Sequence, residues 1–159
     1  MKKLLITALL SASTLLASSI EIDDAYVRAT PPGLPNSAAF LTVKNTTSSD
    51  IDIIKASSDI AQNVELHTHD MKDGIMKMYQ VPKITVPKNA EVTLKPGGYH
   101  VMLIGLNNPL KVGENVALTL ELSNGETKTI NAPIKTVMGG MKHHNMDHDK
   151  MKHHMNHNH

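Results

Sequence analysis

Residues 63–81 read "NVELHTHDMKDGIMKMYQV", and this stretch decides the fold class. Its two halves alternate apolar and other residues, which is the pattern of a half-buried β-strand. Between them, "MKDG" at 71–74 contains the Asp-Gly pair that is typical of a tight hairpin connection. We therefore predict an antiparallel β-hairpin in which 71–74 form the loop and His67 lies opposite Met78.

Alternation sorts the side chains of this hairpin onto two faces. One face is predicted to join the core and carries Val64, Leu66, Tyr79 and Val81. The other face carries His67, His69, Met76 and Met78. A methionine placed for packing alone would share the face of the Leu and Val residues. These methionines are therefore candidate metal ligands, although an exposed methionine can also cover surface or contact a partner.

The rest of the chain continues in short alternating segments separated by turn residues such as "PPGLPN", "KPGG" and "SNG". Strands are predicted at 25–30, 37–45, 51–57, 63–69, 74–81, 90–94, 99–106, 115–122 and 127–134. No window of a dozen residues sustains the apolar period of a helix. The fold class predicted from this pattern is an all-β antiparallel sandwich or barrel.

A second His/Met pair lies in "YHVMLIGL" at 99–106. There Tyr99, Val101 and Leu103 are predicted to alternate with His100 and Met102, so the histidine and the methionine again share the face opposite the apolar one. Residues two apart on a strand project the same way about 7 Å apart, a spacing that one metal ion can bridge. Two independent His/Met pairs off the core face favour a metal site.

The chain has 159 residues, which suffices for one domain with its own core. It opens with "MKKLLITALLSASTLLASS", in which two lysines precede an apolar stretch too short to span a bilayer. Ala17 and Ser19 fit the small-residue rule for cleavage. We interpret residues 1–19 as a secretory signal peptide, with a mature protein that begins near Ile20, lies in the periplasm and has no stable membrane insertion.

Charge and cysteine content exclude several classes of function. Without the signal peptide, 14 Lys and Arg stand against 15 Asp and Glu, so no basic patch for nucleic acid is expected. The sequence contains no cysteine, which excludes disulfides, a lipidated cysteine, zinc–thiolate sites and iron–sulfur clusters. A blue-copper electron carrier, whose site needs a thiolate, is not expected either.

The candidate core ligands are His67, Met78, His100 and Met102. Thioether sulfur is a soft, neutral ligand that contributes little to binding Zn²⁺, Mg²⁺ or Ca²⁺ but suits Cu(I). A site built from imidazoles and thioethers, without thiolate or carboxylate, is therefore predicted to carry copper as Cu(I).

The spacing of these four residues resembles the ligand motif of the periplasmic copper chaperones known as PCuAC. Ten residues separate the first histidine from Met78, and twenty-one more precede the His-x-Met pair. Similar segments include "AYVRATPPGLPNSAAFLTVKN", "VELHTH", "DGIMKM" and "VPKNAEVTLKPGGYHVMLIGL", and the likeness spans Asp23 to Pro133.

This resemblance implies a cupredoxin-like Greek-key fold and a solvent-exposed Cu(I) site formed by the four motif residues. It also implies delivery of copper to an acceptor, either the binuclear copper centre of cytochrome c oxidase or another assembly chaperone. His69 and Met76 lie outside the motif but on the same predicted face, where they are either auxiliary ligands or an access route for copper. Pro96, Gly97 and Gly98 are expected to shape the approach to His100.

The last residues, "MKHHNMDHDKMKHHMNHNH" from Met141, change character completely. Without apolar residues other than Met they are predicted to form a disordered metal-binding tail, which we assign to 139–159 after a copper-binding domain at 20–138. Clustered imidazoles bind Cu(II) well. The candidate tail ligands are His143, His144, Met146, His148, Met151, His153, His154, Met155, His157 and His159. A purification tag is the other interpretation, but tags are usually uninterrupted His runs.

The function predicted from these features is non-enzymatic copper transfer by a monomer. The alternative is periplasmic copper buffering or resistance, carried mainly by the tail. A copper oxidase or oxygenase is disfavoured because the sequence has no cysteine for electron input and the predicted mature N-terminus is not a histidine. "NTT" at 45–47 matches a glycosylation pattern but is more simply interpreted as a loop.

Overall fold

The computed structural model describes residues 18–136, which form ten strands. They are β1 (Ile20–Arg28), β2 (Asn36–Asn45), β3 (Ile51–Ser57), β4 (Ala61–Lys72), β5 (Ile75–Gln80), β6 (Ile84–Val86), β7 (Glu91–Leu94), β8 (His100–Leu106), β9 (Asn115–Leu122) and β10 (Thr127–Lys135). Within these residues no helix has the length and apolar character needed to cross a membrane. Most of the predicted signal peptide, together with the predicted tail, lies outside the described residues.

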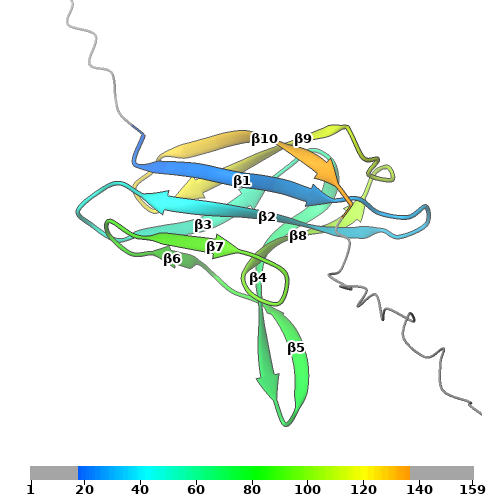
Figure 1. Cartoon of the computed structure of the whole chain (residues 1–159), viewed down its shortest axis with the longest axis horizontal. Coiled ribbons are helices and arrows are strands. Elements are labelled where there is room, and N and C mark those ends of the chain that lie inside the picture. Colours follow the sequence, from blue (N-terminus) through cyan, green and yellow to red (C-terminus); the bar gives the residue numbers. More distant parts are fainter. Residues whose placement is uncertain (1–17, 137–159) are drawn as a thin grey trace, which may run out of the picture.

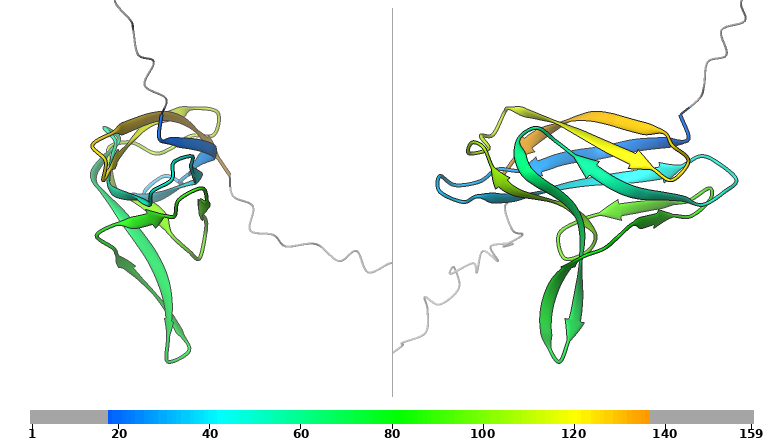
Figure 2. Two further views of the ribbon diagram at one scale, coloured as in Figure 1. Left: turned by 90° about the vertical axis from the view of Figure 1, so that its left-hand side faces the viewer. Right: turned by 180° about the vertical axis from the view of Figure 1, so that it is seen from behind.

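The strands follow one hydrogen-bonded path in the order β5-β4-β8-β2-β1-β10-β9-β3-β6, with β7 also paired to β2. All pairings are antiparallel except that of β1 with β10. Figure 2 shows the path curling round so that its two halves enclose the core as a flattened sandwich. Non-consecutive neighbours such as β2 beside β8 and β3 beside β9 show that the chain crosses over between strands that are distant in the sequence. The predicted all-β fold is confirmed.

The core lies between the two halves of this path and is almost wholly aliphatic. Alternate residues of β9 point inward, as do those of β8, so that Leu118, Leu120, Val101 and Leu103 are fully buried. Burying each such side chain contributes about 1.5–3 kcal/mol to the free energy of unfolding. A core of this size holds the body of the domain rigid and fixes β8, which carries one part of the site.

A bulge in β1 explains why the sequence pattern located only half of that strand. Its register with β2 shifts between Asp23 and Tyr26, where Asp24 adopts a positive φ of 52°. The extra residue exchanges the faces of the strand. Ile20 therefore points inward before the bulge, and Val27 points inward after it. Strict alternation would put residues 20 and 27 on opposite faces, so it cannot identify them as one strand.

The nine predicted segments all correspond to observed strands, with ends that differ by a few residues. The strand that the sequence did not indicate is β6, which has only three residues and lies between two prolines. Tyr99, predicted on the core face of the following segment, precedes β8 and is exposed. The chain has not yet entered the sheet at that point, so alternation does not apply to it.

The β4–β5 hairpin is present, but its predicted register is wrong by two residues. The loop is only Asp73 and Gly74, both with positive φ, which is the conformation of a type I′ turn. His69 therefore lies opposite Met78, and His67 lies opposite Gln80. A shift of two preserves the faces, because the side-chain period of a strand is two.

The hairpin also extends well beyond the body, as Figure 1 shows. Leu66, at its base, is buried, and Val64 and Val81 pack against the core. Tyr79, predicted as a core residue, is 48% exposed because it lies on the projecting part, where no second layer covers either face. The tip of the hairpin is thus free of packing constraints.

Candidate metal centre

The outer face of β1, β2, β8 and β4 carries a row of rings, beginning with Tyr26 and Phe40. Their ring centroids are 5.1 Å apart, and Phe40 lies 6.3 Å from His100. The row continues from His100 to His67 at 5.8 Å and to His69 at 5.1 Å. Because successive strands of one sheet contribute these rings, the fold itself brings the three histidines together.

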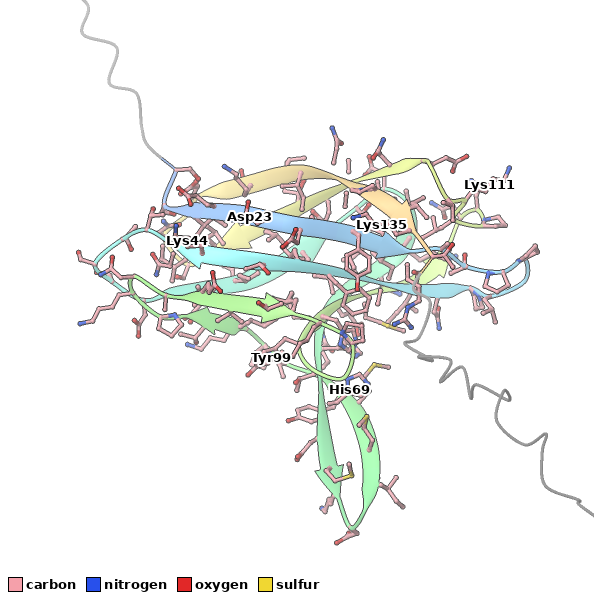
Figure 3. The ribbon with its side chains drawn as sticks, in the orientation of Figure 1. Asp23, Lys44, His69, Tyr99, Lys111 and Lys135 are labelled. Carbon is pink, nitrogen blue, oxygen red and sulfur yellow. The ribbon has the colours of Figure 1, made fainter. Side chains whose placement is uncertain are left out.

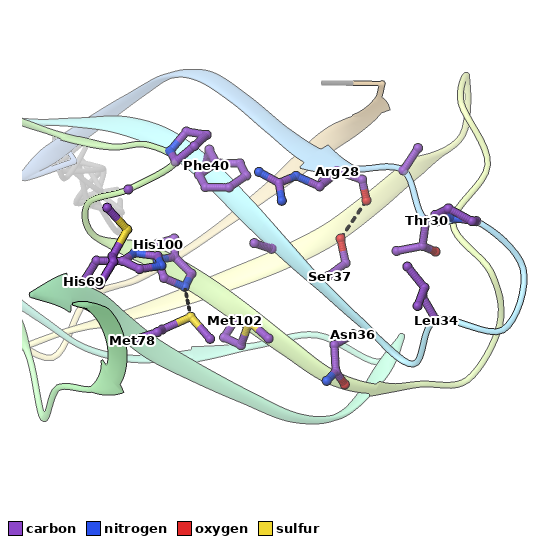
Figure 4. Close-up of a pocket in the computed structure, with 16 residues that line it drawn as sticks. Arg28, Thr30, Leu34, Asn36, Ser37, Phe40, His69, Met78, His100 and Met102 are labelled. Carbon is purple, nitrogen blue, oxygen red and sulfur yellow. Dashed lines mark hydrogen bonds between the residues drawn. The ribbon is translucent and has the colours of Figure 1, made fainter. Parts of the chain in front are cut away.

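Beside this row lies a cavity of about 420 Å³ (Figure 4). Three candidate ligands, Met78, His100 and Met102, line it. The cavity wall also includes His69 and Met76, which are not part of the four-residue ligand motif. Met102 enters from β8, where it lies opposite Ala38 of β2 and Glu65 of β4. In Figure 4 the labelled His69, Met78, His100 and Met102 gather at one end of the cavity.

The ring of His100 is fixed by the loop before β8. It is 98% buried, and its Nδ1 atom lies 3.0 Å from the carbonyl oxygen of Gly98. Since a carbonyl only accepts hydrogen bonds, the hydrogen is on Nδ1. Burial lowers the pKa of His100, and the charges of His69, His67 and Arg28 add to this, against the opposing effect of the Gly98 hydrogen bond.

A neutral His100 with its hydrogen on Nδ1 has a lone pair on Nε2. That atom lies 3.1 Å from the Sδ atom of Met78, a contact drawn as a dashed line in Figure 4. Thioether sulfur also offers only lone pairs. In this neutral tautomer two electron-pair donors face each other, an arrangement that a cation would stabilise.

His67 lies opposite His100 across β4 and β8 and is buried, yet it does not line the cavity. Its Nε2 atom is 2.7 Å from Oε2 of Glu65. Its Nδ1 atom is buried without a hydrogen-bond partner among the described residues. A buried, unpartnered nitrogen is costly, and a metal ion is one way to satisfy it.

His69 is closer to the cavity than the sequence suggested. Its Nδ1 atom approaches the Gly98 carbonyl at 3.5 Å, at the limit of a hydrogen bond, and it lies directly opposite Met78. Pro96 and Gly97 line the same cavity, in agreement with their expected role beside His100. The tail ligands predicted from 143 onward lie outside the described residues.

Three contacts in this site were not predicted from the sequence, although Gly98 itself was expected beside His100. The Gly98 carbonyl orients His100, Glu65 orients His67, and Phe40 packs beside the histidine row. For Glu65 a signal existed, because it shares the face of His67 by alternation. A backbone carbonyl leaves no signal of this kind.

The candidate metal donors that line the cavity are imidazole nitrogens and thioether sulfurs. Between residues 18 and 136 no three His, Cys, Asp or Glu side chains form a group able to hold a metal ion. The side chains of Met76, Met78 and Met102 line the cavity beside His69 and His100. Thioether ligation discriminates against hard cations and against Zn²⁺.

Comparison with known proteins identifies a family and a relative of this chain. The family described as "Putative lipoprotein LpqE-like" matches residues 20–134. "Putative lipoprotein Lxx21020" of Leifsonia xyli subsp. xyli is 34% identical over 124 residues, which cover 77% of this chain and 74% of that protein.

Two solved structures have similar folds. The solution structure of CuI-DR1885 from Deinococcus radiodurans is 33% identical, with a TM-score of 0.59 over 81% of this chain and 85% of that one. The copper-bound PCuAC domain from PmoF2, at 24% identity, shares the fold with a TM-score of 0.64 over 75% of this chain and 94% of that one. The chain therefore belongs to the LpqE-like family and shares the fold of the PCuAC domain.

Proposed function

We propose that this protein is a periplasmic copper chaperone that binds Cu(I) and passes it to an acceptor protein. The proposed ligands are His67, Met78, His100 and Met102, with His69 and Met76 either as auxiliary ligands or as an entry path for copper. The acceptor is either the binuclear copper centre of cytochrome c oxidase or another assembly chaperone, and the protein acts as an exported monomer rather than an enzyme.

The observation that carries this proposal is the contact between His100 and Met78. An imidazole lone pair and a thioether face each other at 3.1 Å on the wall of an open cavity, and the Met102 side chain lines the same wall. Neutral, soft ligands of this kind hold Cu(I) and also release it, because a partner with stronger ligands can replace a thioether. The similar protein from Deinococcus radiodurans was solved in a copper(I) form, CuI-DR1885, which supports the choice of metal.

His67 needs a separate argument because it does not line the cavity. It lies beside His100, its Nδ1 atom lacks a partner among the described residues, and its other ring nitrogen is held by Glu65. Metal-bound histidines commonly donate their second ring N–H to a carboxylate. This support makes His67 a ligand that is already oriented before copper arrives.

The position of the last strand supports a role for the His/Met-rich tail in supplying copper. The carbonyl of Lys135, at the end of β10, accepts a hydrogen bond of 2.9 Å from Ala29, and Ala29 lines the cavity. The tail assigned to 139–159 thus begins four residues beyond a wall of the cavity. An extended chain covers about 3.3–3.6 Å per residue, so the first tail histidines are within reach of the site. Tethering of this kind raises the effective concentration of copper at the cavity.

Copper buffering is the second candidate function, and the tail favours it. Seven of the ten histidines lie there, a capacity larger than one core site requires. Deletion of 139–159 separates the two functions. A chaperone keeps tight one-to-one Cu(I) binding and supports oxidase maturation, whereas a buffer loses most of its capacity and the copper tolerance that depends on it.

The core site is tested by Cu(I) competition titration of the tail-deleted protein beside its Met78→Leu/Met102→Leu variant. Loss of two ligands is expected to weaken binding by more than the ~10- to 100-fold that removal of an outer partner of a ligand costs. Met71→Leu is the matched control, since Met71 does not line the cavity, and it should keep tight binding. Equal affinity of the double variant and its parent would refute the assignment.

A further inference from the structure

The corrected register of the hairpin creates a methionine pair that the sequence did not indicate. Met71 lies directly opposite Met76, one step beyond the His69 and Met78 pair toward the tip. Directly opposed residues have Cβ atoms about 4.5–5.5 Å apart, which lets two flexible thioethers reach the same ion. His69 is the diagonal neighbour of Met76, so its imidazole is within reach as well.

Packing does not explain this pair. Met71 is 61% exposed and Met76 is 56% exposed, on a hairpin that projects from the body (Figures 1 and 3). Neither belongs to the core cluster or packs against it. Two large apolar side chains held in water contribute little to stability, so their pairing beside His69 agrees better with a binding role than with packing.

Near the tip of the hairpin, the charged side chains lie on the face opposite the methionine pair. Asp70 lies opposite Lys77, and Lys72 opposite Ile75, all on the other face by alternation. Next to the methionine pair this face therefore presents two thioethers and an imidazole, and its carboxylate, Glu65, lies at the base of the hairpin beside His67. That set is selective for a soft monovalent cation such as Cu(I).

This outer pair is also continuous with the cavity. Met76 lines the cavity together with His69, and the ring of His69 lies 5.1 Å from that of His100. Along one face the donors run from the exposed Met71 and Met76 through His69 and Met78 to the buried His100. At the inner end, His69 and His100 have ring centroids 5.1 Å apart and His100 Nε2 lies 3.1 Å from Met78 Sδ, so these donors are close enough for an ion to pass between them.

We propose that Met71 and Met76, with His69, form an outer Cu(I) site at which copper is captured before it moves to the cavity. The outer site rests on the proposed copper-chaperone function and extends it. Two thioethers and one imidazole, exposed to water, bind more weakly than the cavity set. The outer site therefore fills after the cavity at equilibrium but lies on the path by which the cavity loads.

The test uses the full chain with ¹³C-labelled methionine methyl groups, titrated anaerobically with Cu(I) and followed by NMR. The methyl signals of Met78 and Met102 should shift first, and those of Met71 and Met76 should shift together in a later, weaker step. In the Met71→Leu variant the shift of Met76 in that later step should be lost. Loading of Met78 from a Cu(I) carrier should also become slower, while its final affinity stays the same.

Ile75→Leu is the matched control, because Ile75 is equally exposed on the same hairpin but faces the other way. It should leave both steps and the loading rate unchanged. A Met71 signal that stays fixed through the whole titration would overturn the outer site and leave this face as a contact surface for a partner. If the Met78 and Met102 signals stay fixed too, the proposed function itself fails, so the two failures are distinguishable.

Discussion

The Nε2 atom of His100 and the Sδ atom of Met78 lie 3.1 Å apart. The first belongs to a strand packed against the core, and the second to a hairpin that projects from it. His100 is on β8, beside fully buried core residues, and its ring is held by the Gly98 carbonyl. Met78 is on the projecting hairpin and is nearly half exposed. In the proposed copper site, one donor is therefore fixed before the ion binds, whereas the other can adjust to the ion or withdraw from it.

The loop that fixes His100 supplies the first prediction. Gly97 has a φ of +81° and Gly98 does not have a positive φ, while a Cβ at either position meets nothing closer than 3.6 Å. Gly97→Ala should therefore strain the loop, lower the free energy of unfolding by about 1–2 kcal/mol and weaken Cu(I) binding. Gly98→Ala keeps the carbonyl and should change neither quantity. Denaturant unfolding and Cu(I) competition measure both, and equal effects of the two variants would contradict the proposed control of His100 by backbone geometry.

A second prediction concerns Glu65, which we expect to position His67. Its carboxylate keeps hydrogen on Nε2, 2.7 Å away, and so leaves Nδ1 with the lone pair. In Glu65→Gln the acceptor is neutral and the preference for this tautomer should weaken, which long-range ¹H–¹⁵N NMR of the His67 ring detects directly. Cu(I) affinity should fall about 10-fold or more.

The control for this experiment is Glu91→Gln, which removes an exposed carboxylate on β7. It should leave the ring signals and the affinity unchanged. If Glu65→Gln also leaves the His67 tautomer unchanged, the carboxylate does not position the ring.

A third prediction follows from Asn45, which is 99% buried. Its Nδ2 group donates to the carbonyls of Ser49 and Val86, and its Oδ1 atom accepts from the N–H and hydroxyl of Thr47. Asn45→Asp replaces both donors by an oxygen that faces two carbonyls, so it should lower the free energy of unfolding by about 3 kcal/mol or more. Asn124→Asp, on an exposed turn, should cost far less. Similar unfolding midpoints for both variants would rule out this role.

The burial of Asn45 also decides how the glycosylation motif at 45–47 is interpreted. The side-chain amide that would carry a glycan is already used in four hydrogen bonds inside the domain. The motif therefore begins at the last residue of β2, and only Thr46 and Thr47 lie in the loop that the sequence interpretation expected.

The alternation of apolar and polar residues predicted the strands because each strand has one face in the core. The prediction failed at residues where neither face, or the other face, is covered by the core. It placed Val101 and Leu103 inside and His100 and Met102 on the other face, all correctly. It failed for Tyr79, which lies where the hairpin has left the body. It also lost the start of β1, because the bulge at Asp24 exchanges the faces without leaving a mark in residue type.

The site was predictable as a set of residue types but not as a set of contacts. The family-like spacing selected Met78, His100 and Met102, which the structure brings to one cavity. A hairpin register depends on turn type, and "MKDG" is compatible with both a four-residue and a two-residue loop. That ambiguity reversed the places of His67 and His69 relative to Met78 and concealed the pairing of Met71 with Met76.

The last prediction concerns Glu126 and the start of the mature chain. Its carboxylate accepts hydrogen bonds from the Ser18 hydroxyl at 2.6 Å, the Ser19 N–H at 3.0 Å and the Ser19 hydroxyl. These bonds, with a smaller effect of Lys128, lower the pKa of Glu126 from 4.5 to about 2. Cleavage after Ser19, as predicted from the sequence, would remove both serines.

A depressed pKa in the folded state adds stability above the unfolded value, and this stability is lost as the pH falls from 4.5 to about 2. A chain that begins at Ser18 should therefore lose more unfolding free energy between pH 6 and pH 3 than one that begins at Ile20. The difference should be small, because solvent screens a partly exposed carboxylate. Glu126→Gln should abolish the difference, and Glu114→Gln, at an exposed position, should not. Urea unfolding of the two chains at both pH values measures it, and mass spectrometry of the exported protein shows which N-terminus the cell makes. Identical pH profiles for the two chains would show that the serines do not stabilise the charged form of Glu126.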